Sequence, residues 1–278
     1  MIVSVSRRCD IPWLQFNWFM HRVRAGFCET VNPFNANQVK RVPLVPVKDD
    51  MKTEEGVETF VFWTRNPCHI LTNADELTER GFCFYVMVTI TGYPKILEPS
   101  MTNISKVLNF VKKLSDKIGK DKVIWRYDPI FLSTITDKDF HLASFNSIAE
   151  MLTGYVRRVI ISTYDEYKES KRRLDYLIRS NFFKMLNQDE ILPDLLTSFK
   201  KSADAAGMEI QSCAQKENYS SYGVKPGACI DAALLDELFG LKFKGKDRNQ
   251  RSNCLCCKSI DIGAYKTCTA GCVYCYAI

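Results

Sequence analysis

Short apolar runs alternate with stretches of helical periodicity along most of the 278-residue chain. The runs Ile2–Ser6, Thr59–Trp63 and Phe82–Thr91 have the length and the β-branched or aromatic content of buried strands. The stretch Asn103–Ile118 has apolar residues at helical spacing and ends at Gly119. Repeated strand-then-helix order predicts a parallel sheet with helices packed outside it.

The fold class predicted from this order is α/β. Roughly seven or eight strand–helix units are expected over residues 1–240, which is close to the number in a TIM-like (β/α)8 barrel. Phe27–Val31 and Val42–Val47 also have the character of strands in this barrel. An open doubly wound sheet is the alternative, but no glycine-rich dinucleotide loop follows the first strand. Residues 241–278 are predicted to form a cysteine-rich tail that packs on the barrel mouth.

The composition is that of an ordinary globular protein, with 46% hydrophobic and 25% charged residues. No apolar run approaches the length needed to span a bilayer, so no membrane association is expected. Residues 1–8 lack the charge-then-apolar order of a secretory signal. A cytoplasmic location with reduced thiols is therefore expected. The formal charge of +6 permits an anionic substrate without requiring one.

Three closely spaced cysteines lie near the end of the sequence in the pattern C-x3-C-x2-C. These residues, termed the tail triplet, are Cys268, Cys272 and Cys275. Three thiolates can ligate three irons of a [4Fe–4S] cluster and leave the fourth iron without a protein ligand. Gly271 permits a backbone turn that other residues resist, and Tyr274 and Tyr276 flank the last cysteine, where they would shield a bound cofactor. Structural zinc is the alternative, although zinc sites usually show two separated ligand pairs.

This motif, with an aromatic residue before its last cysteine, resembles the signature of radical S-adenosylmethionine (SAM) enzymes. The ending Gly-Cys-Val-Tyr-Cys-Tyr-Ala is similar to that of spore photoproduct lyases. The resemblance implies that SAM chelates the open iron. One electron, from a donor such as flavodoxin or ferredoxin, would then cleave SAM to a 5′-deoxyadenosyl radical that abstracts hydrogen from the substrate. In those enzymes the motif follows the first barrel strand, whereas here it comes last, which implies an incomplete or permuted barrel.

A second set of cysteines is distinct from the tail triplet. The motifs Ser-Cys-Ala, Gly-Ala-Cys-Ile-Asp and Cys-x-Cys resemble those of an uncharacterised prokaryotic domain-of-unknown-function family, and this resemblance implies the set. Its members, termed the four-cysteine group, are Cys213, Cys229, Cys254 and Cys256. Four thiolates complete either a closed [4Fe–4S] cluster or a zinc site, and the sequence favours neither strongly. Cys257 is interpreted as an extra cysteine, and the scattered cysteines of the first third of the chain as small buried side chains.

Polar residues follow the apolar runs at the points where predicted strands end. The candidates for a substrate pocket among them are Arg7, Arg8, Asp10, Arg65, Asn66, Arg126 and Asp128. Because the carboxyl ends of parallel strands converge on one face, these side chains are expected to surround a small-molecule or nucleotide-like substrate. Arginine suits a carboxylate or phosphate. Tyr127, Tyr164 and Cys213 are weaker candidates for a radical relay. The alternative is that Arg126–Asp128 and Arg8–Asp10 are structural ion pairs.

Several longer motifs identify the chain as similar to an uncharacterised prokaryotic domain-of-unknown-function family. They include Ser-Arg-Arg-x-Asp-Ile-Pro, Phe-Trp-Thr-Arg-Asn-Pro, Trp-Arg-Tyr-Asp-Pro and Asp-Ile-Gly-Ala-Tyr. The resemblance covers almost the whole chain, and it implies membership without implying an activity.

Two other functions remain open beside a radical SAM enzyme. One is a redox or metal-binding protein without SAM chemistry, and a fourth protein ligand beside the tail triplet would favour it. The other is a hydrolase or lyase that uses the arginine and aspartate residues, with structural zinc in the tail. A basic stretch is also a weak candidate for nucleic-acid contact, although a solvated loop is the usual explanation for such a run. Its residues are Lys242, Lys244, Lys246, Arg248 and Arg251.

Overall fold

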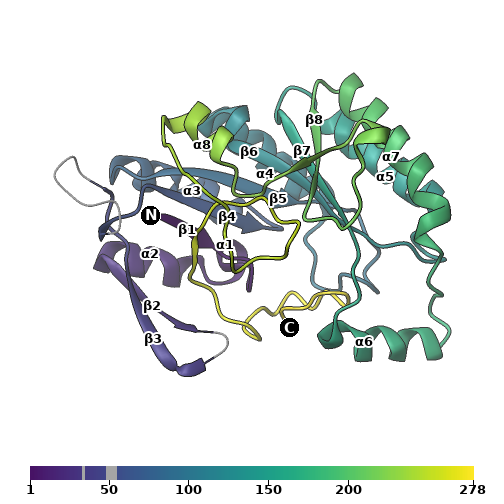
Figure 1. Ribbon diagram of the computed structural model, residues 1–278, viewed down its shortest axis with the longest axis horizontal. Coiled ribbons are helices and arrows are strands. Elements are labelled where there is room, and N and C mark those ends of the chain that lie inside the picture. The colour runs from purple at the N-terminus through teal and green to yellow at the C-terminus, as the bar shows by residue number, and fades with distance from the viewer. Residues whose placement is uncertain (33–34, 48–54) are drawn as a thin grey trace.

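The computed structural model describes residues 1–32, 35–47 and 55–278. Eight strands form one sheet in which every neighbouring pair is parallel, in the order β10-β1-β4-β5-β6-β7-β8-β9 (Figure 1). These strands are β1 (Ile2–Val5), β4 (Thr59–Thr64), β5 (Cys83–Thr89), β6 (Val123–Ile130), β7 (Arg158–Thr163), β8 (Glu209–Cys213), β9 (Lys225–Gly227) and β10 (Ile260–Asp261). The predicted α/β class with a parallel sheet is confirmed.

Helices follow most of the strands, and most of these helices cover one face of the sheet. They are α1 (Ile11–Leu14), α2 (Phe16–Ala25), α3 (Cys68–Glu79), α4 (Ile104–Ile118), α5 (Lys138–Leu152), α6 (Lys168–Arg179), α7 (Gln188–Ala205) and α8 (Ala232–Phe239). Side chains alternate along each strand, so Phe60 and Phe62 pack against α2 while Val61 and Trp63 face the opposite way. The second face is covered by α8 and by the segments that carry the four-cysteine group.

The sheet does not close into a barrel within the described residues, because its edge strands β9 and β10 pair only with β8 and β1. Two predicted barrel strands also lie elsewhere. Strands β2 (Phe27–Asn32) and β3 (Asn35–Pro43) form a separate antiparallel hairpin. Covered and exposed side chains alternate along β2, whereas most described residues of β3 are exposed, so the hairpin lies largely at the surface and cannot occupy the interior of a parallel sheet.

An aromatic core fills the space between the sheet and its helices. Trp125 and Tyr127 of β6 pack on Phe145 of α5, and Phe145 stacks on Phe199 of α7 with ring centroids 3.9 Å apart. The Tyr127 hydroxyl lies 2.8 Å from Nδ1 of His141, so Tyr127 faces the helices. No helix in the described ranges is long and apolar enough to cross a membrane.

Candidate functional site

A cavity of about 530 Å³ lies at the carboxyl ends of the central strands. Most of the predicted strand-end residues line it, and these are Arg7, Arg8, Asp10, Arg65, Arg126 and Asp128. All the cysteines of the tail triplet and of the four-cysteine group line the same cavity, as do Tyr164, Tyr274 and Tyr276. Parallel strands place their carboxyl ends on one edge, which explains why residues far apart in sequence meet here.

Three predicted site residues do not line the cavity. The Asn66 side chain accepts a hydrogen bond from the Cys68 amide at 3.1 Å and donates to the Thr102 hydroxyl at 3.0 Å, so it joins the start of α3 to the loop before α4. Gly271 has a φ of +74°, and a Cβ there would lie 3.2 Å from Cγ of Pro99. This glycine therefore shapes the tail backbone, as expected of it, without contacting the cavity. Tyr127 belongs to the helix-facing core.

The proposed ion pairs differ from one another. Arg126 pairs with Asp128, whose carboxylate also accepts from the Ser162 hydroxyl. Asp10 instead accepts from the backbone amides of Trp13 at 3.0 Å and of Arg65 at 2.7 Å. Burial raises the pKa of Asp10 to about 7. The aspartate thus fixes the first turn of α1 and the loop after β4, rather than pairing with Arg8.

The tail triplet lies beside Cys9, one of the scattered cysteines for which the sequence predicts only burial. Cys9 follows β1, and its thiol is hydrogen-bonded to that of Cys268. This bond lowers the pKa of Cys268 to about 6 and raises that of Cys9. Burial raises the pKa of Cys272 to about 12 and also raises that of Cys275, while the charge of Arg65 opposes both shifts. Four thiols therefore gather at this end of the cavity.

The four-cysteine group is assembled from three separate segments. The Cys229 thiol donates to the sulfur of Cys213 at 3.0 Å. Cys256 is hydrogen-bonded to both Cys229 and Cys254, and these bonds lower its pKa. Cys256 also accepts from the amide of Ile230 at 3.3 Å. The structure thus brings together the predicted members of this group.

Cys257 is separate from the four-cysteine group. It is buried, its amide donates to the Ile230 carbonyl at 2.9 Å, and it does not line the cavity. The interpretation of Cys257 as an extra cysteine agrees with this placement.

Both sets of thiols have the donor chemistry of a soft-metal or iron–sulfur site. Among the residues that the structure describes, no three Cys, His, Asp or Glu side chains are already arranged to hold a single metal ion. A cationic side chain lies close to each set of cysteines. The charge of Arg65 favours lower pKa values for the tail triplet, and the charge of Arg126 favours a lower pKa for Cys229. Such charges favour thiolates, which are the form that binds metal. The residues present therefore fit a negatively charged metal–thiolate group.

A buried ion pair fixes the tail to the strand ends. Arg65 Nη1 lies 2.7 Å from Oε1 of Glu98, and their side chains are 13% and 3% exposed. Arg65 Nη2 also donates to the Tyr274 hydroxyl at 2.6 Å, and that hydroxyl donates to Glu98. Thr91 donates to the same Glu98 oxygen at 3.0 Å. The network joins the loops after β4 and β5 to the middle of the tail triplet.

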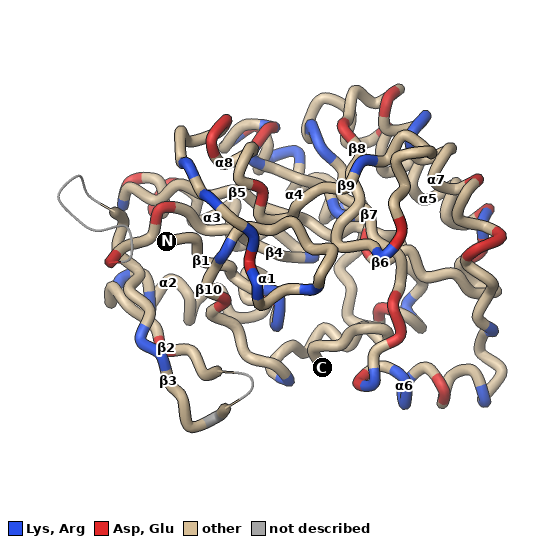
Figure 2. Tube along the Cα trace, viewed as in Figure 1, with Lys and Arg blue, Asp and Glu red and all other residues tan. Residues whose placement is uncertain are grey.

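Helix α6 also anchors the last residues of the chain, through hydrogen bonds from Arg173. The Arg173 guanidinium donates to the backbone carbonyls of Val273 at 3.1 Å and Ile278 at 3.2 Å, and to that of Cys275. Residues 267–278 contain no Lys, Arg, Asp or Glu, so this segment is tan in Figure 2. The uncharged tail is thus held by side chains that other elements supply.

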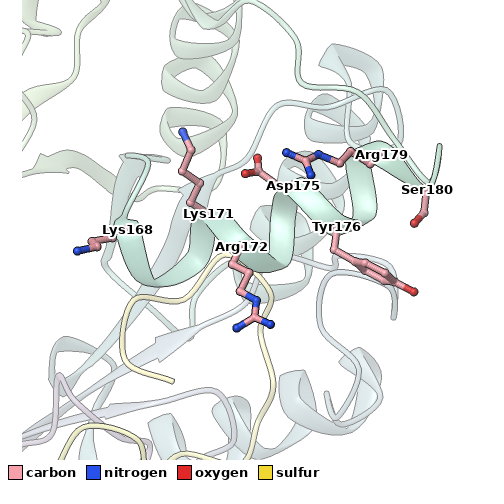
Figure 3. A pocket seen from close by; sticks show the side chains of 7 residues that line it. All are labelled: Lys168, Lys171, Arg172, Asp175, Tyr176, Arg179 and Ser180. Atoms are coloured by element: carbon pink, nitrogen blue, oxygen red, sulfur yellow. The ribbon is translucent and has the colours of Figure 1, made fainter.

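Arg173→Ala is expected to loosen the tail without unfolding the protein. Hydrogen bonds from a charged donor contribute about 1.5–3 kcal/mol each, so amide exchange in residues 266–278 should accelerate about tenfold or more. Hydrogen exchange measured by mass spectrometry would show this change. Arg172→Ala is the matched control, because Arg172 lies next to it on α6 and lines only the surface hollow of Figure 3. Equal exchange in the two variants would contradict the anchoring role.

The hollow in Figure 3 is separate from the candidate site. It has a volume of about 530 Å³ and is lined only by residues 168–180 of α6 and its end. Lys168, Lys171 and Arg179 line it, whereas no cysteine and no predicted strand-end residue does. The cavity that combines cysteines with strand-end arginines is therefore the candidate functional site.

Comparison with known proteins identifies the family. No curated protein and no solved structure matches the chain. One family model, described as Domain of unknown function (DUF1848), matches residues 2–277. The membership expected from the longer sequence motifs is confirmed, and the chain belongs to the DUF1848 family.

Proposed function

We propose that this protein is an iron–sulfur enzyme that performs radical SAM-type chemistry on a small-molecule or nucleotide-like substrate. One observation carries the proposal: the tail triplet, the four-cysteine group and the strand-end arginines line a single cavity. An open-iron [4Fe–4S] cluster at the tail triplet would supply the electron for reductive cleavage of SAM. The four-cysteine group would hold a fully ligated second cluster that relays electrons or anchors the tail.

The position of the tail supports this assignment. In the enzymes that the motif resembles, the cysteines follow the first strand of the barrel. Here the tail lies against the segment that follows β1, through the Cys9–Cys268 hydrogen bond and a 2.9 Å bond from the Tyr276 hydroxyl to the Arg7 carbonyl. The tail thus reaches the same place by a different chain order, which is what a permuted arrangement requires.

The strand order supports an incomplete barrel rather than a doubly wound sheet. From β4 to β9 the neighbours in the sheet follow the order of the chain. Helices α3, α4, α5 and α7 all pack on the same side of these strands. A doubly wound sheet would reverse its order and place crossover helices on both faces. We infer that the fold is a barrel interrupted between β9 and β10.

The side chains of the protein would have distinct tasks in this reaction. Arg65 is positively charged beside the tail triplet and would favour the thiolate form of its cysteines. Tyr274 and Tyr276 would cover the cofactor, since both line the cavity and their hydroxyls are bonded to Glu98 and to the Arg7 carbonyl. The strand-end arginines would hold the substrate.

Cys9 supports the second candidate function, a redox or metal-binding protein without SAM chemistry. Its thiol meets that of Cys268 and lines the same cavity. A fourth thiolate on the tail cluster would saturate it and leave no iron open for SAM. The role of Cys9 therefore separates the two candidates.

Metal analysis and SAM turnover of anaerobically purified protein would test the proposal. Two [4Fe–4S] clusters require about eight irons and eight sulfides per chain, with a broad visible absorption that dithionite bleaches. Reduced protein supplied with SAM should release 5′-deoxyadenosine. Zinc without sulfide would remove the iron–sulfur assignment, and fully loaded clusters that do not cleave SAM would remove the radical assignment.

Cys9→Ser is expected to keep the tail cluster and to retain SAM cleavage within about twofold, because three cysteines suffice for an open-iron site. The measurement is 5′-deoxyadenosine release together with iron content. Cys83→Ser serves as the control, since Cys83 is partly buried at the start of β5 and does not line the cavity. If Cys9→Ser lost the cluster while Cys83→Ser kept it, the electron-carrier function would be favoured instead.

A further inference from the structure

Three residues that line the cavity each carry a buried N–H group that lacks an acceptor among the described residues. These groups are Nε of Arg7, Nε1 of Trp63 and Nε of Arg126. The other two buried polar atoms without a partner, on Arg22 and Gln211, belong to residues that do not line the cavity. A buried donor without an acceptor destabilises the folded protein, so a cluster of three indicates that an acceptor belongs there.

These three side chains form one compact unit. The guanidinium carbons of Arg7 and Arg126 lie 5.6 Å and 4.7 Å from the centre of the Trp63 ring. Trp63 is the penultimate residue of β4 and is 8% exposed, while Arg7 follows β1 and Arg126 belongs to β6. Packing on the same indole restricts both guanidinium groups, so the unit is organised before any ligand arrives.

Positive charge is less fully compensated here than at the other arginines of the cavity. Arg65 is paired with Glu98, and Arg251 is paired with Asp165 at 2.6 Å. Arg126 pairs with Asp128, whereas the Arg7 side chain makes no ion pair among the described residues and donates to the Ser259 hydroxyl at 2.6 Å. Two guanidinium groups therefore share one carboxylate beside the three N–H groups that lack an acceptor.

We propose that Arg7, Trp63 and Arg126 form an oxoanion subsite that binds a carboxylate or phosphate group of the substrate. This inference rests on the proposed function, because only an enzyme would bind the oxoanion as part of a substrate. It adds that this substrate is anionic. Planar guanidinium groups match both oxoanions, which supply the acceptors that the three N–H groups lack. The subsite lies toward the four-cysteine group, since Arg126 is close enough to Cys213 and Cys229 for a charge interaction. SAM would instead lie at the tail triplet.

Calorimetry on anaerobically purified, metal-loaded protein tests the subsite with two simple probes, inorganic phosphate and acetate. The probe that binds more tightly shows which oxoanion the substrate carries. Trp63→Phe removes one N–H and keeps a flat ring, and Arg126→Lys keeps the charge and removes the planar fork. Each variant should weaken binding of the preferred probe about tenfold, the cost of one charge-assisted hydrogen bond. Iron content and thermal unfolding would verify that both variants remain folded and loaded.

Arg251→Lys is the matched control, because Arg251 lines the same cavity but is already paired with Asp165. It should leave probe binding unchanged. Equal binding by wild type, Trp63→Phe and Arg126→Lys would overturn the subsite, as would binding of neither probe. Binding only to metal-stripped protein would also overturn it, since the donors would then serve the four-cysteine group. Displacement of the probe by SAM would assign the oxoanion to SAM instead of the substrate.

Failure of the subsite can be distinguished from failure of the proposed function. Probe binding that depends on Trp63 and Arg126, in protein that cannot cleave SAM, would retain the subsite and reject the radical assignment. SAM cleavage by protein that binds neither probe would retain the radical assignment and reject the subsite.

Discussion

Replacement of Cys272 by alanine is expected to abolish reductive cleavage of SAM and to remove the tail cluster. Cys272 is the central member of the tail triplet, is buried, and lies close enough to Cys268 and Cys275 for their charges to raise its pKa. Without it the triplet retains two thiols, which cannot hold a [4Fe–4S] cluster as three do. Because Cys9 meets Cys268 in the same cavity, the substitution is made in the Cys9→Ser background, so that no third thiol remains.

The expected result is a fall of 5′-deoxyadenosine release to background and a loss of about four irons per chain from the eight that two clusters would supply. Iron analysis and product quantification on the same anaerobic preparation measure both effects. Cys257→Ala is the control, since Cys257 is equally buried but does not line the cavity. SAM cleavage by Cys272→Ala at the wild-type rate would exclude the tail triplet as the site of this chemistry.

Much of the candidate site was predictable from strand ends alone. A parallel sheet brings its carboxyl ends together, so Arg7, Arg65 and Arg126 meet although three different strands carry them. A second rule, the alternation of side chains along a strand, explains why Tyr127 lies outside the cavity. Side chains alternate along a strand, so a residue between Arg126 and Asp128 must face the helices when those two face the cavity. That signal was present in the sequence.

Cys9 could not be found from spacing, because its neighbour Cys268 lies at the opposite end of the chain. The available clue was its position between Arg8 and Asp10, which were themselves expected at a strand end. It was equally hard to predict from the sequence that the sheet remains open. The edge strands β9 (Lys225–Gly227) and β10 (Ile260–Asp261) have only three and two residues, too few for a recognisable apolar pattern.

The ion pair between Arg65 and Glu98 explains how an uncharged tail is held at a polar cavity. Burial disfavours the charge of Arg65, but Glu98 and Tyr274 compensate, so the pKa of Arg65 is raised. One side of this pair comes from the loop after β4 and the other from the loop after β5, while Tyr274 belongs to the tail. The network therefore couples the stability of the strand ends to the position of the tail triplet.

Glu98→Ala is expected to destabilise the protein by about 3–5 kcal/mol, because it leaves the Arg65 charge buried without its partner. Loss of the Tyr274 contact should also release the tail, so cluster content should fall together with the unfolding midpoint in urea. Glu237→Ala removes one of the two carboxylate partners of Arg157 at the surface, where Glu237 and Arg157 are 50% and 39% exposed, and it should leave both measurements nearly unchanged. A double variant, Arg65→Met with Glu98→Leu, should recover most of the stability, because no charge is then left unpaired. It should not recover cluster content, because neither new side chain can form a hydrogen bond with the Tyr274 hydroxyl. Recovery of both would show that the ion pair stabilises the fold without positioning the tail.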